Sequence, residues 1–308
     1  MSLFQPSTKA VSAAAQEIAD TVGASGDGEM TARAGRSLFA ALEHFNNRAN
    51  WNFALTEATP LQVFAPFTVT GITASAGQAS AAAPAGHGIK TDDFISASGF
   101  MVGTRVSATA ASGFGIFGVV TGFSAGATVV SGDFVRDMYD LPSDWKAEYT
   151  VRLLGAQRTL RPTGRRFYDR SITSEQQTAS VWNYDLFMVG SVGKIRLLPP
   201  PPTADVLLMR YYRRMTVPTT TATASVLDVP QDYEAYLISW AKWHFLADKG
   251  EGRGEQIKTW FSLAQEGLVT MLREQTRRPD QDLAFIPGQF VYGGWNDTTT
   301  RFINWEST

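Results

Sequence analysis

Apolar residues recur at helical spacing near both ends of the chain. Residues 8–22 are rich in alanine, glycines interrupt residues 23–28, and Leu38, Leu42 and Phe45 then fall on one helical face. After Pro230 one stripe is formed by Tyr236, Leu237, Trp240, Trp243, His244 and Ala247, and a second stripe over 257–272 follows a glycine break. The pattern predicts two helices at each end, which pack most economically as one bundle.

The pattern changes in the middle of the chain. Between residues 60 and 133, Gly, Ala, Ser, Thr and Val dominate, and short apolar runs alternate with glycines. This composition indicates either a small all-β insertion or a loosely ordered loop. Strand-like runs follow at 149–154, 181–189, 194–198 and 206–212, and four prolines at 199–202 form a stiff connection between the last two.

These patterns together predict an α+β protein, with a helical bundle formed by the N- and C-terminal helices, an inserted antiparallel β domain and an extended C-terminal tail. The expected segments are the N-terminal helices of the bundle (1–57), a Gly/Ala/Thr-rich β insertion (58–135), a β domain (136–226), the C-terminal helices of the bundle (227–276) and a C-terminal docking tail (277–308).

The composition argues against several classes of function and location. The 308 residues include no cysteine, which excludes disulfides and thiolate chemistry. Lys and Arg number 27 against 29 Asp and Glu, so the net charge of 27 − 29 = −2 provides no global attraction for nucleic acid. The first ten residues do not resemble a signal peptide, and no apolar run approaches the roughly 18 residues of a membrane span. We therefore expect neither export nor membrane insertion.

No motif in the sequence supports catalysis. The run GFGIFG at 113–118 spells G-x-G-x-x-G, but a helix does not follow it, so we interpret it as strand and turn glycines. The histidines, His44, His87 and His244, lack the spacing of a metal site. The acidic pairs Asp92/Asp93 and Asp280/Asp282 are interpreted as solvated turn residues. We expect no enzyme activity, no metal and no cofactor.

Two groups of residues are candidates for contact with partners. The more basic of two arginine-rich patches comprises Arg158, Arg161, Arg165, Arg166 and Arg170. This patch could contact DNA in a channel, could contact acidic neighbours in a ring, or could be a solvated face. The C-terminal residues lack periodicity but keep large aromatics that could anchor on a partner or fold back on the bundle, namely Phe290, Tyr292, Trp295, Phe302 and Trp305.

The order of several segments resembles the head-to-tail adaptor family of short-tailed and related phages. The segments are NNRANWNF at 46–53, LPSD at 141–144, the unit IRLLPP at 195–200 with LLMRYY at 207–212, and VPQDYEAY at 229–236. The resemblance implies a helical core with a β domain, a ring of about twelve copies, and a C-terminal extension that reaches the portal. The insertion at residues 60–133 is longer than this family leads us to expect.

The resemblance thus implies a structural protein of the virion neck, made in the host cytoplasm, that joins the portal to a tail or nozzle protein. DNA would pass transiently through its channel without sequence-specific binding. Two alternatives remain open at this point. The chain could be another virion protein, such as a tail-tube or capsid-associated protein, or a polysaccharide-binding tail protein, although hydrolysis would require two placed carboxylates.

Overall fold

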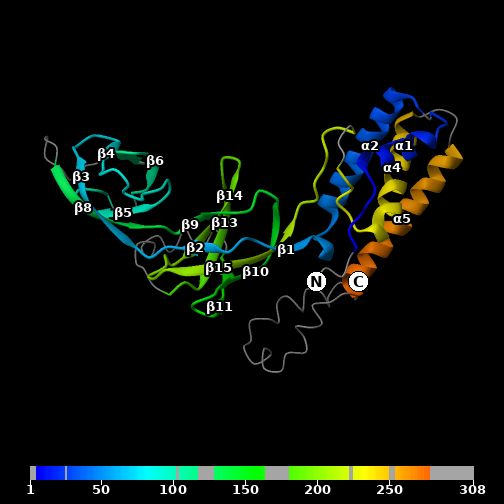
Figure 1. The fold of residues 1–308 in the computed structure, drawn as a ribbon. Helices are drawn as coiled ribbons and strands as arrows, with labels where there is room; N and C mark the ends of the chain where they lie inside the picture. The colour runs from blue at the N-terminus through cyan, green and yellow to red at the C-terminus, as the bar shows by residue number, and fades with distance from the viewer. Residues whose placement is uncertain are drawn as a thin grey trace, which may run out of the picture. The chain divides into compact units, whose positions relative to one another are not determined.

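The computed structural model describes residues 5–24, 26–101, 104–116, 128–163, 180–221, 225–249 and 254–277. The chain forms two compact units. We call Met1–Phe53 with Met215–Thr308 the helical unit, and Ala54–Arg214 the β unit. Figure 1 shows that helices dominate the first and strands the second.

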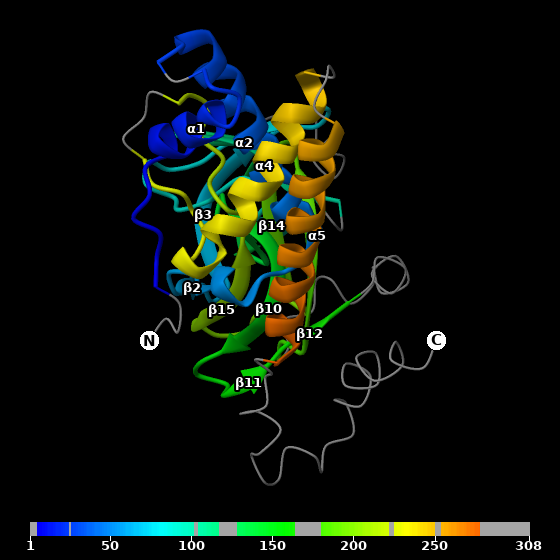
Figure 2. The same ribbon diagram turned by 90° about the vertical axis from the view of Figure 1, so that its right-hand side faces the viewer.

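The helical unit takes its helices from both ends of the chain. These are α1 (Val11–Asp20), α2 (Gly28–Arg48), α4 (Glu234–Lys249) and α5 (Gly254–Arg277), with short 3-10 turns η1 (Asn52–Ala54) and η3 (Gln231–Tyr233). Helix α2 begins where the Asp27 carboxylate accepts hydrogen bonds from the backbone N–H groups of Glu29 and Met30, at 2.9 and 3.3 Å. Helices α4 and α5 lie side by side (Figure 2).

The buried faces of α2 and α5 are the ones that periodicity predicts. Leu38, Leu42 and Phe45 of α2 are buried, as are Ala264, Leu268 and Met271 of α5. The stripe expected on α4 is correct only in part. Leu237 and Trp240 are buried as expected, but His244 and Ala247 are exposed, and Ile238, Ala241 and Phe245 complete the buried face. Helix α4 contacts both α2 and α5, so apolar residues surround much of it and periodicity does not single out one face.

Backbone hydrogen bonds tie the chain's first described residues to the segment before α4. The N–H of Ser7 donates to Val229 O at 3.1 Å, and the N–H of Val11 donates to Ser225 O at 2.9 Å. At the end of α2, the Asn46 side chain bonds both backbone groups of Met215, at 2.7 and 3.0 Å. The helical unit is therefore closed by residues distant in sequence.

Part of the β unit is a sheet whose two edges meet. It contains β3 (Phe67–Ala74), β4 (Ser80–Ala82), β5 (Phe94–Ala97), β6 (Val106–Ala110), β7 (Gly113–Ile116) and β8 (Thr128–Val135), in the order β5-β8-β3-β4-β7-β6. The edges join because Asp92 N–H donates to Val106 O at 2.8 Å and Val106 N–H donates to Asp93 O at 3.0 Å. We call this the closed sheet. Its interior is filled by one apolar cluster that includes Ile72, Phe114 and Phe134.

Two further sheets of the β unit share a second core. One contains β1 (Leu55–Glu57), β2 (Leu61–Val63), β10 (Trp145–Leu153), β11 (Arg158–Thr159) and β15 (Asp205–Arg213), and the other contains β9 (Met138–Asp140), β12 (Arg161–Pro162), β13 (Asn183–Val189) and β14 (Val192–Leu198). Val151 and Leu207 of the first sheet pack with Tyr184 and Ile195 of the second. The two sheets thus bury one apolar layer between them.

The fold class expected from the sequence is wrong. Among the described residues, fifteen strands in three sheets outweigh four α-helices, so the chain is mostly β and not a helical bundle with one inserted β domain. The error concerns the share of sheet in the chain, because the β insertion expected near residues 60–133 forms a six-stranded sheet of its own in addition to the expected β domain. Pairing between distant strands, which periodicity cannot show, holds that segment in the closed sheet.

Candidate interaction surfaces

A buried ionic network lies where the closed sheet continues into β9. The Arg136 guanidinium donates two hydrogen bonds to the Asp93 carboxylate, from Nε to Oδ1 and from Nη2 to Oδ2, each 2.9 Å long. The Asp93 side chain is only 1% exposed, and its Oδ2 also accepts from Lys90 N–H at 2.8 Å. The interpretation of Asp93 as a solvated turn residue is therefore wrong, because this carboxylate is fully paired inside the protein.

A second bidentate pair adjoins the first. Arg105 donates to both carboxylate oxygens of Asp137, at 3.0 and 2.9 Å, and to the backbone oxygen of Asp92 at 2.6 Å. Its guanidinium carbon lies 3.4 Å from the centre of the Phe94 ring. Arg196 of β14 adds a contact of 3.6 Å from Nε to Asp137 Oδ2. Asp137 therefore meets two cations in a buried position.

Lys194 of β14 connects the network to its exposed rim. Its ammonium lies 2.9 Å from Asp140 Oδ1 and 3.2 Å from Asp92 Oδ2. Burial disfavours the charged form of Lys194, but the hydrogen bonds that its ammonium donates to Asp140 and Asp92, with the attraction of their charges, outweigh burial and raise the pKa of Lys194. Asp92 is thus paired as well, so neither acid of this turn is the solvated residue expected.

The network is balanced in charge. Four acids, Asp92, Asp93, Asp137 and Asp140, face four cations, Arg105, Arg136, Lys194 and Arg196, giving 4 − 4 = 0. Hydrogen bonds of Tyr139 fix the backbone next to the network. Its hydroxyl donates to Arg136 O at 3.0 Å and accepts from Phe64 N–H at 3.2 Å. Burial raises the pKa of Tyr139 to about 12. The arrangement fixes the loop before β5 against β14 and suits a structural role.

The sequence contained a signal for this network that residue spacing did not reveal. Between Glu57 and Asp133 the only charged residues are Lys90, Asp92, Asp93 and Arg105. Charges that are so scarce in an otherwise uncharged segment are candidates for internal pairing. Their cationic partners Arg136, Lys194 and Arg196 come from other segments, and only the fold brings them together.

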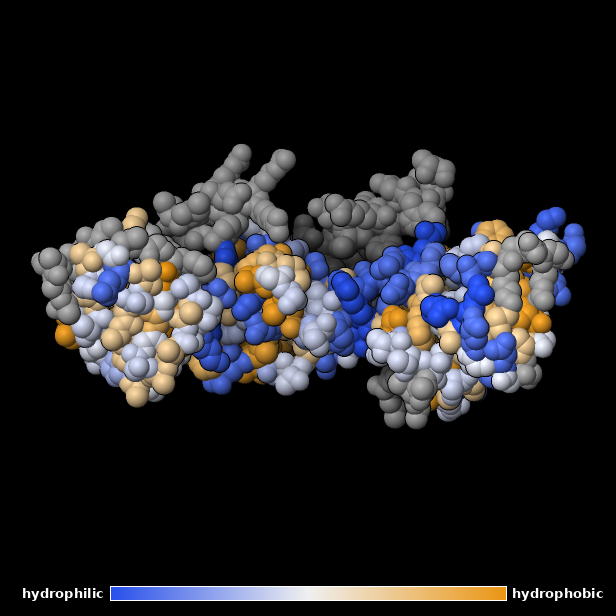
Figure 3. All heavy atoms as spheres, turned by 90° about the horizontal axis from the view of Figure 1, so that it is seen from above, coloured by the Kyte–Doolittle hydropathy of each residue, from blue (hydrophilic) through white to orange (hydrophobic). Residues whose placement is uncertain are grey.

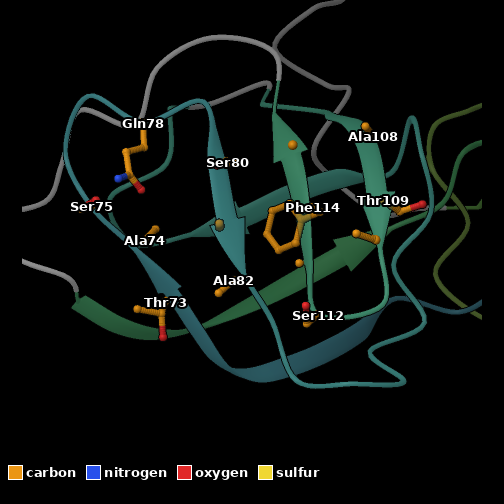
Figure 4. Close-up of a pocket in the computed structure, with 14 residues that line it drawn as sticks. Thr73, Ala74, Ser75, Gln78, Ser80, Ala82, Ala108, Thr109, Ser112 and Phe114 are labelled. Atoms are coloured by element: carbon orange, nitrogen blue, oxygen red, sulfur yellow. The ribbon is translucent and has the colours of Figure 1, made fainter.

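A pocket of about 620 Å³ lies on the closed sheet (Figure 4). We call it the β4–β7 pocket. None of the 14 residues that line it is charged, and small side chains such as Ala82, Ala110 and Ser112 predominate. An added Cβ at Gly113 would lie 2.7 Å from the backbone oxygen of Ala81, so this strand pair admits only glycine there. The run interpreted as strand and turn glycines lies in strand β7 up to Ile116, and its last two residues fall outside the described residues.

A second surface is the end of the β13–β14 hairpin. The residues of β14 that pair with β9 begin at Lys194, and toward the turn the two hairpin strands continue without β9 to the pair Val189 and Val192. Met188, Val189 and Val192 are 63%, 43% and 44% exposed. We call residues 188–192 the β13–β14 tip. Figure 1 shows this hairpin extending beyond its sheet, and hydrophobic spheres gather over it in Figure 3.

The structure places two of the five predicted patch arginines. Arg158 lies in β11, with its guanidinium carbon 3.4 Å from the centre of the Trp182 ring, and Arg161 is exposed in β12. Trp182 itself is 57% exposed, a feature that the sequence did not single out. Arg165, Arg166 and Arg170 lie outside the described residues, as does Asp280 with Asp282.

All five predicted portal anchors also lie outside the described residues, namely Phe290, Tyr292, Trp295, Phe302 and Trp305. Two of the three histidines, His44 and His244, lie in the helical unit and interact electrostatically, and His87 lies in the β unit. His44 stacks on Trp240 with ring centres 4.2 Å apart, His87 bonds Ala110 O at 3.0 Å, and His244 is exposed. No group of three or more potential metal ligands occurs within the described part of the chain.

Within the described residues, no helix has the length and apolar character needed to cross a membrane. Comparison with known families finds one described as SU10 adaptor protein, whose model matches residues 119–284. The match spans β8 to β15 of the β unit and helices α4 and α5. A search of curated proteins finds no match.

Proposed function

Because this chain belongs to the SU10 adaptor family of phage head-to-tail adaptor proteins, we propose that it forms a non-catalytic ring in the virion neck, between the portal and the tail or nozzle. The observation that carries the proposal is the family match across more than half of the chain. The ionic network adds support, because each of its four acids is paired with a cation, which suits a structural role more than acid–base chemistry.

Copy number in the purified particle tests this proposal. We expect one copy per portal subunit, about twelve per particle if the ring matches a twelvefold portal, measured by mass spectrometry with isotope-labelled peptides. A many-to-one ratio would instead indicate a tube or capsid protein. Absence of the chain from the particle would reject the structural role.

We further propose that the C-terminal aromatics anchor the chain on the portal. Phe302 and Trp305 are the first candidates, with Phe290, Tyr292 and Trp295 as a second group, because aromatic side chains commonly fill pockets at interfaces. Replacing Phe302 and Trp305 with serine should weaken binding to purified portal rings at least about tenfold, given typical anchor energies. A matched change of Thr298 and Thr299 to serine should leave binding unchanged, and equal binding by both variants would contradict the proposal.

The arginine patch is proposed to face DNA during its passage through the ring. Arg158 and Arg161 belong to the described part of this patch, and the net charge of −2 suits a channel that does not hold DNA tightly. Changing Arg158 and Arg161 to glutamine should alter the rate of DNA ejection from otherwise complete particles. Unchanged ejection would contradict contact with DNA and leave either acidic neighbours or solvent as the surroundings of these side chains.

A further inference from the structure

The β13–β14 tip is an uncharged hairpin end with exposed apolar side chains. Residues 186–193 carry no charge, and the exposed side chains of Met188, Val189 and Val192 cluster around a turn at Gly190 and Ser191. The cross-strand ladder holds these apolar groups at the end of a regular hairpin. Contiguous exposed apolar groups of this kind mark contact sites on soluble proteins.

The β4–β7 pocket has the complementary character. It is uncharged and lined mainly by small side chains, with the hydroxyls of Thr73, Ser80 and Ser112 around Ala82 (Figure 4). Such a surface accepts apolar side chains without desolvating a charge. Its hydroxyls can also bond the peptide groups of a hairpin turn. The closed sheet around the pocket is nearly free of charge, since most of its few ionic residues are committed to the network.

We propose that the β13–β14 tip of one copy inserts into the β4–β7 pocket of a neighbouring copy. This inference rests on the proposed ring and supplies the contact within it. The tip and the pocket are different surfaces of the same chain, so their contact is heterologous, and a heterologous contact repeated with a closing rotation generates a ring. Neither surface carries a charge, so two copies of a chain with net charge −2 meet here without local repulsion.

The tip is too small to hold two copies together by itself. A five-residue tip buries far less than the roughly 1,200–2,000 Å² of a stable interface. The contact therefore forms only when other interfaces bring copies together, as assembly on a portal template would do. Copies in free solution are expected to remain apart.

The absence of cysteine from the natural sequence allows a direct test by disulfide trapping in assembled particles. Met188→Cys combined with Ala82→Cys should give, on mild oxidation, a ladder of covalent oligomers that reductant removes. The matched control combines Met188→Cys with Val129→Cys, because Val129 is 67% exposed on the closed sheet but does not line the pocket. The control should remain monomeric.

The outcomes separate this inference from the proposed function. A ladder from both pairs, from neither pair, or a disulfide to a different virion protein overturns the inference, and a portal-matched copy number would then still support the adaptor role. A chain missing from particles rejects both.

A second variant tests the same contact without a disulfide. Met188→Asp should lower the number of copies per particle about tenfold, because a charge would enter an uncharged pocket, whereas Val129→Asp should leave it unchanged. Equal incorporation of both variants would overturn the inference.

Discussion

Individual buried side chains in this protein are fixed by partners that lie far away in the sequence. Asp93 is the clearest case, because it is nearly inaccessible and receives two hydrogen bonds from Arg136 and one from Lys90 N–H. Breaking a buried pair leaves an uncompensated charge, while an exposed pair contributes little because water screens it. The two kinds of ion pair in the β unit can therefore be compared directly.

Asp93→Ala should lower the free energy of unfolding by about 3–5 kcal/mol, because it leaves the Arg136 guanidinium buried without its carboxylate. The control is Glu57→Ala, which removes the exposed partner of Arg210 and should cost less than about 1 kcal/mol. Urea denaturation of the three proteins measures both effects. Equal midpoints for the two variants would show that the network adds nothing to stability.

His44 makes the helical unit sensitive to acid. Burial lowers its pKa, as do the nearby charges of Arg48 and His244, and its Nε2 is buried without a hydrogen-bond partner among the described residues. A histidine whose pKa is lowered by folding contributes stability above its ordinary pKa of about 6.5, and this contribution is lost as the pH falls below that value. Protonation would also charge a ring stacked on Trp240.

We expect the melting temperature of the helical unit to fall between pH 7 and pH 5. His44→Phe, which keeps an aromatic ring against Trp240 but cannot bind a proton, should show a smaller fall. Circular dichroism at 222 nm during heating measures both proteins. The same pH dependence in the variant would assign the effect to other groups.

At the scale of elements, one glycine sets how closely two helices approach. A Cβ added at Gly267 of α5 would lie 2.4 Å from Tyr236 Cδ1 and 2.8 Å from Tyr236 Cβ. Helix propensity favours alanine over glycine by about 1 kcal/mol, so propensity alone makes Gly267 unfavourable. The close contact between α4 and α5 explains its presence.

Gly267→Ala should destabilise the protein by about 1–2 kcal/mol, because overpacking outweighs the gain in propensity. Gly28→Ala, at the start of α2 with no atom within 4 Å of the added Cβ, serves as the control and should not destabilise. Thermal unfolding distinguishes them. A stabilised Gly267→Ala variant would mean that α4 and α5 can separate without cost.

At the scale of the whole molecule, the β unit is a continuous segment placed within a discontinuous helical unit. The chain enters and leaves the β unit through neighbouring strands, since Leu55 of β1 pairs with Tyr212 of β15. Asn46 and Met215, which bond each other in the helical unit, flank the same junction. A short linker can therefore span the distance between the two ends of the β unit.

A shortened chain in which a short Gly-Ser linker joins Phe53 to Met215 should keep a helical far-ultraviolet spectrum and unfold cooperatively on heating. The isolated segment 54–214 should give a β spectrum and unfold separately. A shortened chain that loses its helical spectrum would show that the helices depend on the β unit for their stability.

The sequence alone determined the helices, the main strands after residue 145 and the adaptor resemblance, because these depend on local periodicity and on motifs in order along the chain. The tertiary structure alone decided the predominance of sheet, the paired state of Asp92 and Asp93, and the formation of the apolar β13–β14 tip and of the uncharged β4–β7 pocket. Each of these depends on which distant residues become neighbours, as when Arg136, Lys194 and Arg196 meet the acids of one turn. A carboxylate next to glycines is solvated or buried according to whether such cations reach it, and no local pattern contains that information.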